Sequence, residues 1–166
     1  MTVIAWIMEG TWPACVDAVR AHAPEDADIV LLHVSGPEVP GAARGAYAGL
    51  LGRARPDLDP GTEMEHIAAV SAELLLAAAA DRLGRPCTRE ERQGRAEREV
   101  VAAAEGAELL VIARDGDRSH LGPPSLSPAG RFIVDHAPCS VLLVWPEAAP
   151  CASTLPPSPH GPHHCG

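Results

Sequence analysis

The sequence predicts an α/β fold: a three-layer sandwich in which helices cover both faces of a five-strand parallel sheet. Short apolar runs alternate with segments of helical periodicity along the chain, and this alternation is typical of parallel strands joined by helical crossovers. Several of the runs are apolar at every position, as expected for strands buried on both faces. We expect strands at residues 3–8, 29–34, 87–92, 109–113 and 140–145.

The first strand leads through a turn into a helix. The run at 3–8 ends at Glu9-Gly10, and Thr11-Trp12-Pro13 then supplies an N-cap candidate and a proline suited to the first helical turn. After the second strand, residues 35–62 are rich in glycine and proline. We expect an irregular insert there, either a lid or a surface excursion, with at most a short helix at 42–51.

A long helix is expected at residues 63–83, and its apolar residues recur at helical spacing. They fall on one stripe, the pattern of a helix that packs on a core. The stripe consists of Met64, Ile67, Val70, Leu74, Leu75 and Ala78.

The second half of the chain is built from short elements. In order, we expect a charged edge strand at 87–92, a helix at 95–105, a strand at 109–113, a loop at 114–128, a helix at 129–136 and a strand at 140–145. Residues 1–146 would then form one domain. The tail, 147–166, has little apolar surface to bury, so we expect it to be disordered.

Composition excludes several classes of protein. The net charge of −9 argues against sequence-independent nucleic-acid binding, which needs a basic footprint. All 13 basic residues are arginine, so there is no Walker-A or Schiff-base lysine. No apolar run approaches the roughly 18 residues of a membrane helix, and Glu9 interrupts the apolar start of the chain. We therefore expect a cytoplasmic protein with no membrane association, whose five cysteines stay reduced.

Three motifs, taken in order, resemble the universal stress protein family. The turn Glu9-Gly10-Thr11 resembles the acidic-glycine-hydroxyl turn after that family's first strand, and Leu32-His33-Val34 is similar to the end of its second strand. The stretch 136–144, HAPCSVLLV, resembles its C-terminal signature. The resemblance spans about residues 1–146 and implies a flavodoxin/Rossmann-like sheet (adenine nucleotide alpha hydrolase-like) and a homodimer.

The resemblance also implies a test for ATP binding. The family's ATP-binding branch carries Gly-x-x-Gly, nine residues, then Gly-Ser/Thr after the fourth strand, where backbone N–H groups and a helix N-terminus can hold phosphate. In this chain those four positions are Arg114, Asp117, Ser127 and Pro128, and Gly116 lies one residue out of register. The phosphate motif is therefore degenerate.

Nucleotide binding stays a hypothesis because ligands of such folds bind beyond the carboxyl ends of strands where the winding reverses. With the family's strand order, Glu9 and Arg114 would flank that crevice. Glu9 could accept hydrogen bonds from ribose hydroxyls, and Arg114 or Arg118 could pair with a phosphate. The candidate ATP-binding residues are Glu9, Gly10, Val34, Arg114, Gly116, Arg118, Gly122 and Ser127.

Two alternatives stay open. One is an interaction module that binds no nucleotide and acts on an unknown protein partner through its dimer surface or tail. The other is an enzyme such as a slow nucleotide hydrolase, which the lack of a recognisable catalytic motif disfavours. We expect a homodimer through Val141–Trp145, because an apolar edge strand needs covering. The cysteine and histidine spacing of the tail matches no structural zinc pattern, so no metal site is expected.

Overall fold

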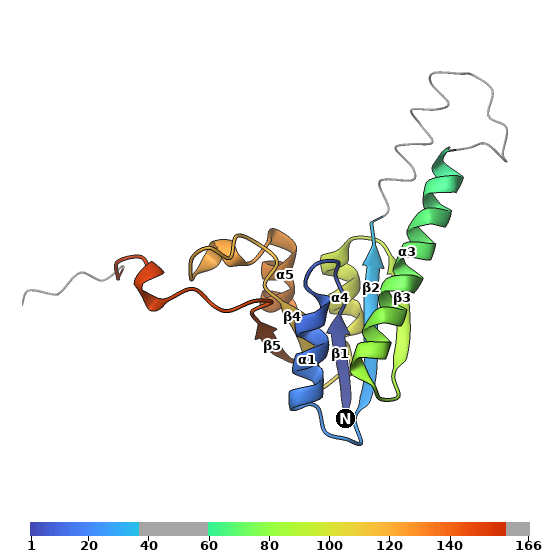
Figure 1. Ribbon diagram of the computed structural model, residues 1–166, viewed down its shortest axis with the longest axis horizontal. Coiled ribbons are helices and arrows are strands. Elements are labelled where there is room, and N and C mark those ends of the chain that lie inside the picture. The colour runs from blue at the N-terminus through green and yellow to red at the C-terminus, as the bar shows by residue number, and fades with distance from the viewer. Residues whose placement is uncertain (37–59, 159–166) are drawn as a thin grey trace, which may run out of the picture.

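All five strands lie in one parallel sheet, in the order β3-β2-β1-β4-β5. The computed structural model describes residues 1–36 and 60–158, with backbone only at 60–62. Figure 1 shows the sheet with β1 at its centre. The strands are β1 (Thr2–Trp6), β2 (Asp28–Ser35), β3 (Thr88–Gln93), β4 (Leu109–Ala113) and β5 (Ser140–Val144). The predicted fold class is confirmed.

Helices cover the two faces of the sheet in pairs. Helices α1 and α3 contact each other on one face, and α4 and α5 contact each other on the other (Figure 1). Alternate residues of β1 serve the two cores: Val3 and Ala5 pack toward α1 and α3, and Ile4 and Trp6 toward α4 and α5. The helices are α1 (Trp12–His22), α3 (Pro60–Leu83), α4 (Ala96–Ala103) and α5 (Pro128–His136), with one-turn 3₁₀ helices η2 (Pro123–Ser125) and η3 (Ala152–Thr154).

The buried face of α3 differs from the predicted stripe. Ile67, Val70 and Leu74 keep 56%, 42% and 66% of their surface exposed. The side chains that enter the core are Ala72, Leu76, Ala79 and Leu83. The apolar residues of this alanine- and leucine-rich helix are spread over nearly its whole circumference. Their spacing alone therefore does not show which face is buried. Packing against β2 and α1 selects it, and two alanines on the buried face allow close approach.

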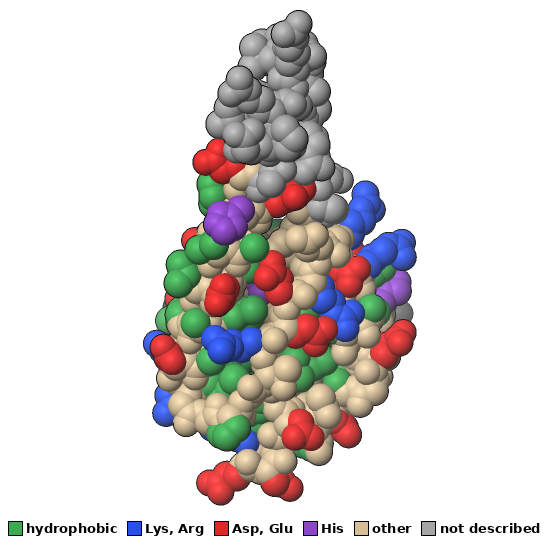
Figure 2. Space-filling view, turned by 90° about the vertical axis from the view of Figure 1, so that its right-hand side faces the viewer, with side chains coloured by type: hydrophobic (Ala, Val, Ile, Leu, Met, Phe, Trp, Pro, Cys, Tyr) green, Lys and Arg blue, Asp and Glu red, His purple; other side chains and the backbone are tan. Residues whose placement is uncertain are grey.

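The surface over α3 and β3 carries both hydrophobic and charged side chains. Figure 2 shows hydrophobic side chains there, interspersed with acidic and basic ones. The charged strand β3 is the sheet edge on this side, as its sequence predicts. Within residues 1–36 and 60–158, no helix combines the length and the apolar character needed to cross a bilayer.

One expectation falls outside the described residues, and a second falls partly outside them. The predicted short helix at 42–51 lies among residues 37–59, which the structure does not describe. In the tail, η3 forms a single turn, and the Thr154 hydroxyl accepts a hydrogen bond from the Leu121 amide at 3.0 Å. Residues 159–166 lie outside the description. The disorder of 147–166 and the domain boundary at residue 146 therefore stay predictions.

Candidate ligand cavity at the carboxyl ends of β1 and β2

The chain turns sharply after β1 and leaves Glu9 at the carboxyl edge of the sheet. The amides of Thr11 and Trp12 both donate to the Met8 carbonyl, at 3.3 and 3.0 Å, and start α1. Gly10 sits in this turn at φ +86°, a left-handed conformation that side chains rarely adopt. Glu9, in this turn, is exposed.

His33 is fixed at the end of the neighbouring strand. Its Nδ1 lies 2.8 Å from the Ile7 carbonyl oxygen, in a partly buried contact. A carbonyl oxygen can only accept, so Nδ1 carries the hydrogen of this bond. In the neutral ring Nε2 is then left as an acceptor.

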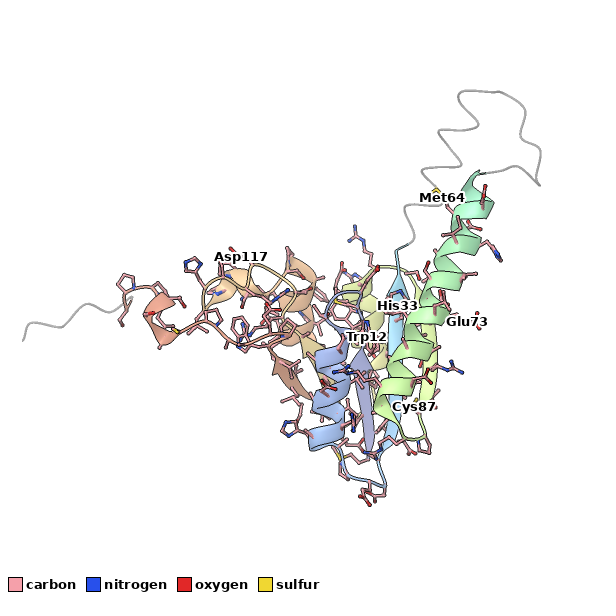
Figure 3. All side chains as sticks on the ribbon, in the orientation of Figure 1. Trp12, His33, Met64, Glu73, Cys87 and Asp117 are labelled. Carbon is pink, nitrogen blue, oxygen red and sulfur yellow. The ribbon has the colours of Figure 1, made fainter. Side chains whose placement is uncertain are left out.

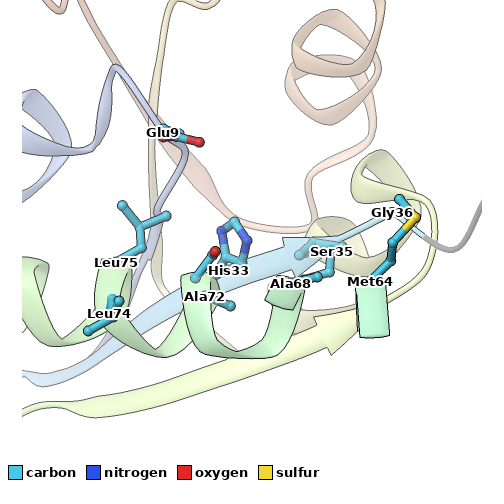
Figure 4. A pocket seen from close by; sticks show the side chains of 11 residues that line it. Glu9, His33, Ser35, Gly36, Met64, Ala68, Ala72, Leu74 and Leu75 are labelled. Atoms are coloured by element: carbon cyan, nitrogen blue, oxygen red, sulfur yellow. The ribbon is translucent and has the colours of Figure 1, made fainter. Parts of the chain in front are cut away.

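A cavity of about 650 Å³ opens between these strand ends and α3. In Figure 4 the His33 ring lies between the turn that carries Glu9 and helix α3. The volume falls within the roughly 300–1,000 Å³ typical of small-molecule sites. Lining residues include Glu9, His33 and Ser35 on the sheet side and Met64, Ala72 and Leu75 on the helix side.

The cavity wall is mainly apolar and carries one carboxylate, that of Glu9. No arginine is among the described residues that line it. The Ser35 hydroxyl donates to Glu91 Oε1 at 3.3 Å, so its remaining capacity is as an acceptor. Glu9, His33 and Ser35 therefore offer acceptors to a ligand, and the Ser71 hydroxyl, which also lines the cavity, can donate or accept.

The loop after β4 closes on itself. The amides of Gly116 and Asp117 donate to the carbonyls of Ser125 and Pro124, at 2.9 and 2.8 Å. A Cβ on Gly116 would overlap the Pro124 carbonyl oxygen, so only glycine allows this approach of the two backbones. Two N–H groups of the loop are thereby used within it.

Asp115, in the same loop, bonds the residue that precedes α5. Its carboxylate accepts from the Ser127 amide at 2.8 Å and from the Ser127 hydroxyl at 2.5 Å. Ser127 Oγ in turn accepts from the Gly130 amide at 3.0 Å, as an N-cap side chain does. A Cβ on Gly130 would lie 2.9 Å from Asp115 Oδ1, so the carboxylate fills the space beside the first turn of α5.

The two arginines of the loop are bound to the protein itself. Arg114 donates to the Ser125 hydroxyl, and its guanidinium lies 4.6 Å from the centre of the Trp145 ring. Arg118 Nε pairs with Glu147 at 2.5 Å, and its Nη1 donates to the Arg114 carbonyl at 3.3 Å. Arg114 Nε is buried and has no partner among the described residues.

The structure separates the predicted site residues into two groups. Glu9 and Val34 line the cavity, and Gly10 forms the turn beside it. None of the five candidates in the loop after β4 lines the cavity. These five are Arg114, Gly116, Arg118, Gly122 and Ser127.

Three features of the site were missed by sequence reasoning. The sequence resemblance places His33 only at the end of the second strand, and its position in the wall of a cavity was not foreseen. The α3 wall, including Met64 and Leu75, depends on tertiary packing. The role of Asp115 could have been suspected from a serine N-cap followed by Pro128.

Metal binding finds no support in the described part of the chain. Within it, no three histidine, cysteine, aspartate or glutamate side chains gather closely enough to hold an ion. Burial raises the pKa of the Cys15 thiol to about 12, which makes it a core residue rather than a ligand or nucleophile. The tail histidines lie outside the described residues.

The fold and cavity define a small α/β protein with a doubly wound parallel sheet and a ligand-sized opening at the carboxyl ends of its strands. The sequence profile described as the universal stress protein family matches residues 9–144. The chain belongs to the universal stress protein family. A search of curated protein sequences gives no match.

Solved structures with this fold are similar in shape and distant in sequence. A hypothetical protein that served as a test case for assigning biochemical function from structure has a TM-score of 0.65 at 14% identity, over 89% of this chain and 97% of its own. A universal stress protein in complex with cAMP has a TM-score of 0.58 at 16% identity, over 89% and 98%. A universal stress protein family protein from Arabidopsis thaliana with AMP bound has a TM-score of 0.55 at 18% identity, over 96% and 97%.

Proposed function

We propose that this chain is a cytoplasmic, non-catalytic binding protein that takes part in a stress response by holding an adenine-containing ligand. The observation that carries the proposal is the cavity lined by Glu9, His33 and Val34 at the carboxyl ends of β1 and β2. Ligands of doubly wound sheets bind beyond this edge. Two proteins of the same fold hold cAMP and AMP, which supports an adenine compound as the ligand here.

The chemistry of the cavity suits an adenosine group. Val34, Met64 and Leu75 offer apolar surface to a purine ring. Glu9 can accept from ribose hydroxyls, and His33 Nε2 can accept from an exocyclic amine or a hydroxyl. In this proposal the sheet edge supplies the polar contacts and α3 supplies the apolar wall.

Titration calorimetry with adenosine, AMP, cAMP and ATP tests the proposal on the full chain. We expect saturable binding of at least one of them, weakened about tenfold or more in Glu9→Ala, since a charged hydrogen-bond partner contributes about 1.5–3 kcal/mol. Glu105→Ala is the matched control, because this exposed glutamate follows α4, outside the cavity lining. Absence of binding by all four ligands to folded protein would refute the proposal.

The proposal of a non-catalytic role rests on the groups that face the cavity. The Ser35 hydroxyl donates to Glu91, and His33 Nδ1 is used by the Ile7 carbonyl. No serine–histidine hydrogen bond occurs among the described residues of the cavity wall, so a base-activated nucleophile is not assembled there. We expect no divalent-dependent phosphate release from ATP above a heat-denatured control.

A homodimer through Val141–Trp145 belongs to the same proposal. Strand β5 pairs only with β4 in the described sheet, and its side chains are half-buried. An open apolar edge is a pairing surface. Light scattering at micromolar concentration should give twice the monomer mass, and the monomer mass at all concentrations would exclude the dimer. The same open edge favours the second candidate function, a protein-interaction module that needs no nucleotide.

A further inference from the structure

We propose that the cavity takes an uncharged purine nucleoside in preference to its phosphorylated forms, because the protein's own Asp115 carboxylate holds the anion position at the start of α5. The inference rests on the proposed function, since it names the class of adenine compound that the cavity accepts. Four features of the structure support it: the cavity wall, the closed loop after β4, the Asp115 carboxylate at the start of α5, and the contacts that hold the two arginines of the loop.

Most polar side chains of the described cavity wall accept hydrogen bonds, and the Ser71 hydroxyl can also donate one. Glu9 is an acceptor, and the free nitrogen of His33 is an acceptor in the neutral ring. A purine nucleoside brings an exocyclic amine and ribose hydroxyls, which donate. An ionised phosphate group brings only acceptors, and it would meet the negative Glu9 with no arginine in the described wall to offset the repulsion.

The loop after β4 has little left to offer a phosphate. Loops at the carboxyl edge hold phosphate through free backbone N–H groups. Here the Gly116 and Asp117 amides already donate hydrogen bonds to carbonyls of the same loop. The overlap that a Cβ on Gly116 would make with the Pro124 carbonyl shows how closely the two backbones pack, so opening the loop would break these contacts.

The start of α5 already holds an anion. Helix N-termini favour negative charge because their first N–H groups lack partners within the helix. The Asp115 carboxylate accepts from both the amide and the hydroxyl of Ser127, at 2.8 and 2.5 Å. It also lies against Gly130, in the space beside the first helical turn. A phosphate brought to this helix start would have to displace the Asp115 carboxylate and would be repelled by it.

Arg114 and Arg118 cannot replace the backbone N–H groups of the loop as phosphate donors unless their present contacts break. Arg114 is bound to Ser125 and packs over Trp145, and Arg118 is paired with Glu147. Arg114 Nε is buried without a partner among the described residues, and Arg114 does not line the cavity.

Calorimetry on the full chain at constant ionic strength tests the preference. We expect adenosine to bind tightest and AMP and ATP to bind progressively more weakly, with at least about a tenfold loss between adenosine and ATP. AMP or ATP binding as tightly as adenosine would overturn the inference and leave the proposed function intact. Failure of all of them to bind would overturn the proposed function, and the inference with it.

Variants at Asp115 test the cause of the preference. Asp115→Asn keeps an oxygen for Ser127 and removes the charge, so ATP should bind at least about fivefold more tightly while adenosine affinity stays within about twofold. The matched control is Asp117→Asn, in the same loop, because the partners of this carboxylate are the amide and hydroxyl of Ser119. An equal gain in the control, or none in Asp115→Asn, would contradict the assigned role.

A second variant keeps the test valid where Asp115→Asn unfolds. Glu9→Gln removes the charge of Glu9 from the cavity wall and leaves the loop after β4 unchanged. It should reduce the ratio between the dissociation constants of ATP and adenosine. An unchanged ratio, in protein whose circular dichroism matches the parent, would contradict the inference.

Discussion

Replacing Leu76 and Leu74 by alanine, one at a time, tests which face of α3 enters the core. Leu76 is 4% exposed and belongs to the cluster with Leu31 and Val16. Leu74, two residues earlier, is 66% exposed. Both substitutions remove the same atoms from the same helix, and alanine favours the helix in both.

The burial values set the expected magnitudes. Truncating a buried leucine costs about 2–5 kcal/mol, through lost transfer free energy and the cavity left behind. Leu76→Ala should therefore lower the free energy of unfolding by about 3 kcal/mol. At Leu74 only about a third of the side chain is covered, so the loss should stay below about 1 kcal/mol.

Urea denaturation followed by circular dichroism measures both values on the full chain. The midpoint for Leu76→Ala should fall well below that of Leu74→Ala, at an unchanged dependence on urea. A larger loss for Leu74→Ala would restore the stripe predicted from the sequence and contradict the described packing of α3. Equal losses would likewise refute the face assignment.

Three further predictions concern the loop, an ion pair and a thiol. Gly116→Ala should destabilise the fold by more than about 1 kcal/mol in urea, since the new methyl group overlaps a backbone carbonyl; an unchanged midpoint would contradict the closed loop. The hydrogen bond from Arg82 lowers the pKa of Asp17, so their contribution to stability is complete above the ordinary carboxyl pKa of about 4 and is lost as pH falls through the lowered value. Because both side chains are half exposed, Asp17→Asn should reduce the acid dependence of the urea midpoint only slightly, and an increase would refute the pairing. Mass spectrometry after iodoacetamide at pH 8 should find Cys151 alkylated and Cys15 unmodified in native protein, because burial raises the Cys15 pKa to about 12; rapid labelling of Cys15 would contradict its burial.

Local sequence pattern was sufficient to predict the sheet. The runs that became β1, β2 and β4 are apolar at nearly every position, and only a strand covered on both faces requires that. The charges of Thr88–Gln93 likewise predicted an edge, because a central strand could not bury them. Both predictions depend only on residues that are close together in the sequence, so the local pattern is enough to make them.

Features that depend on contacts between distant segments were not predictable in this way. The buried face of α3 is selected by β2 and α1, as the exposed Leu74 shows. The cavity arises because parallel strands bring Glu9 and His33 to one edge, opposite a helix that starts after residue 59. Figure 3 shows Met64 in α3, His33 in β2 and Trp12 in α1, three elements that are separate in the sequence.

Where the glycine motif is degenerate, the structure places the Asp115 carboxylate against Ser127, and the residue spacing could not predict this contact. The sequence showed that Asp117 and Pro128 depart from a phosphate-binding pattern. It did not show that the neighbouring Asp115 turns inward to bond Ser127, which requires the loop to fold back over 12 residues. The loss of the motif therefore coincides with an internal carboxylate at the same helix end.

Mapping adenosine binding by amide chemical shifts in ¹⁵N-labelled full-length protein tests the central claim most directly. We expect the largest shifts at Glu9, at residues 33–36 and along residues 64–75 of α3, with little change in residues 114–128. Shifts concentrated in residues 114–128, or no shifts at saturating adenosine, would contradict the claim.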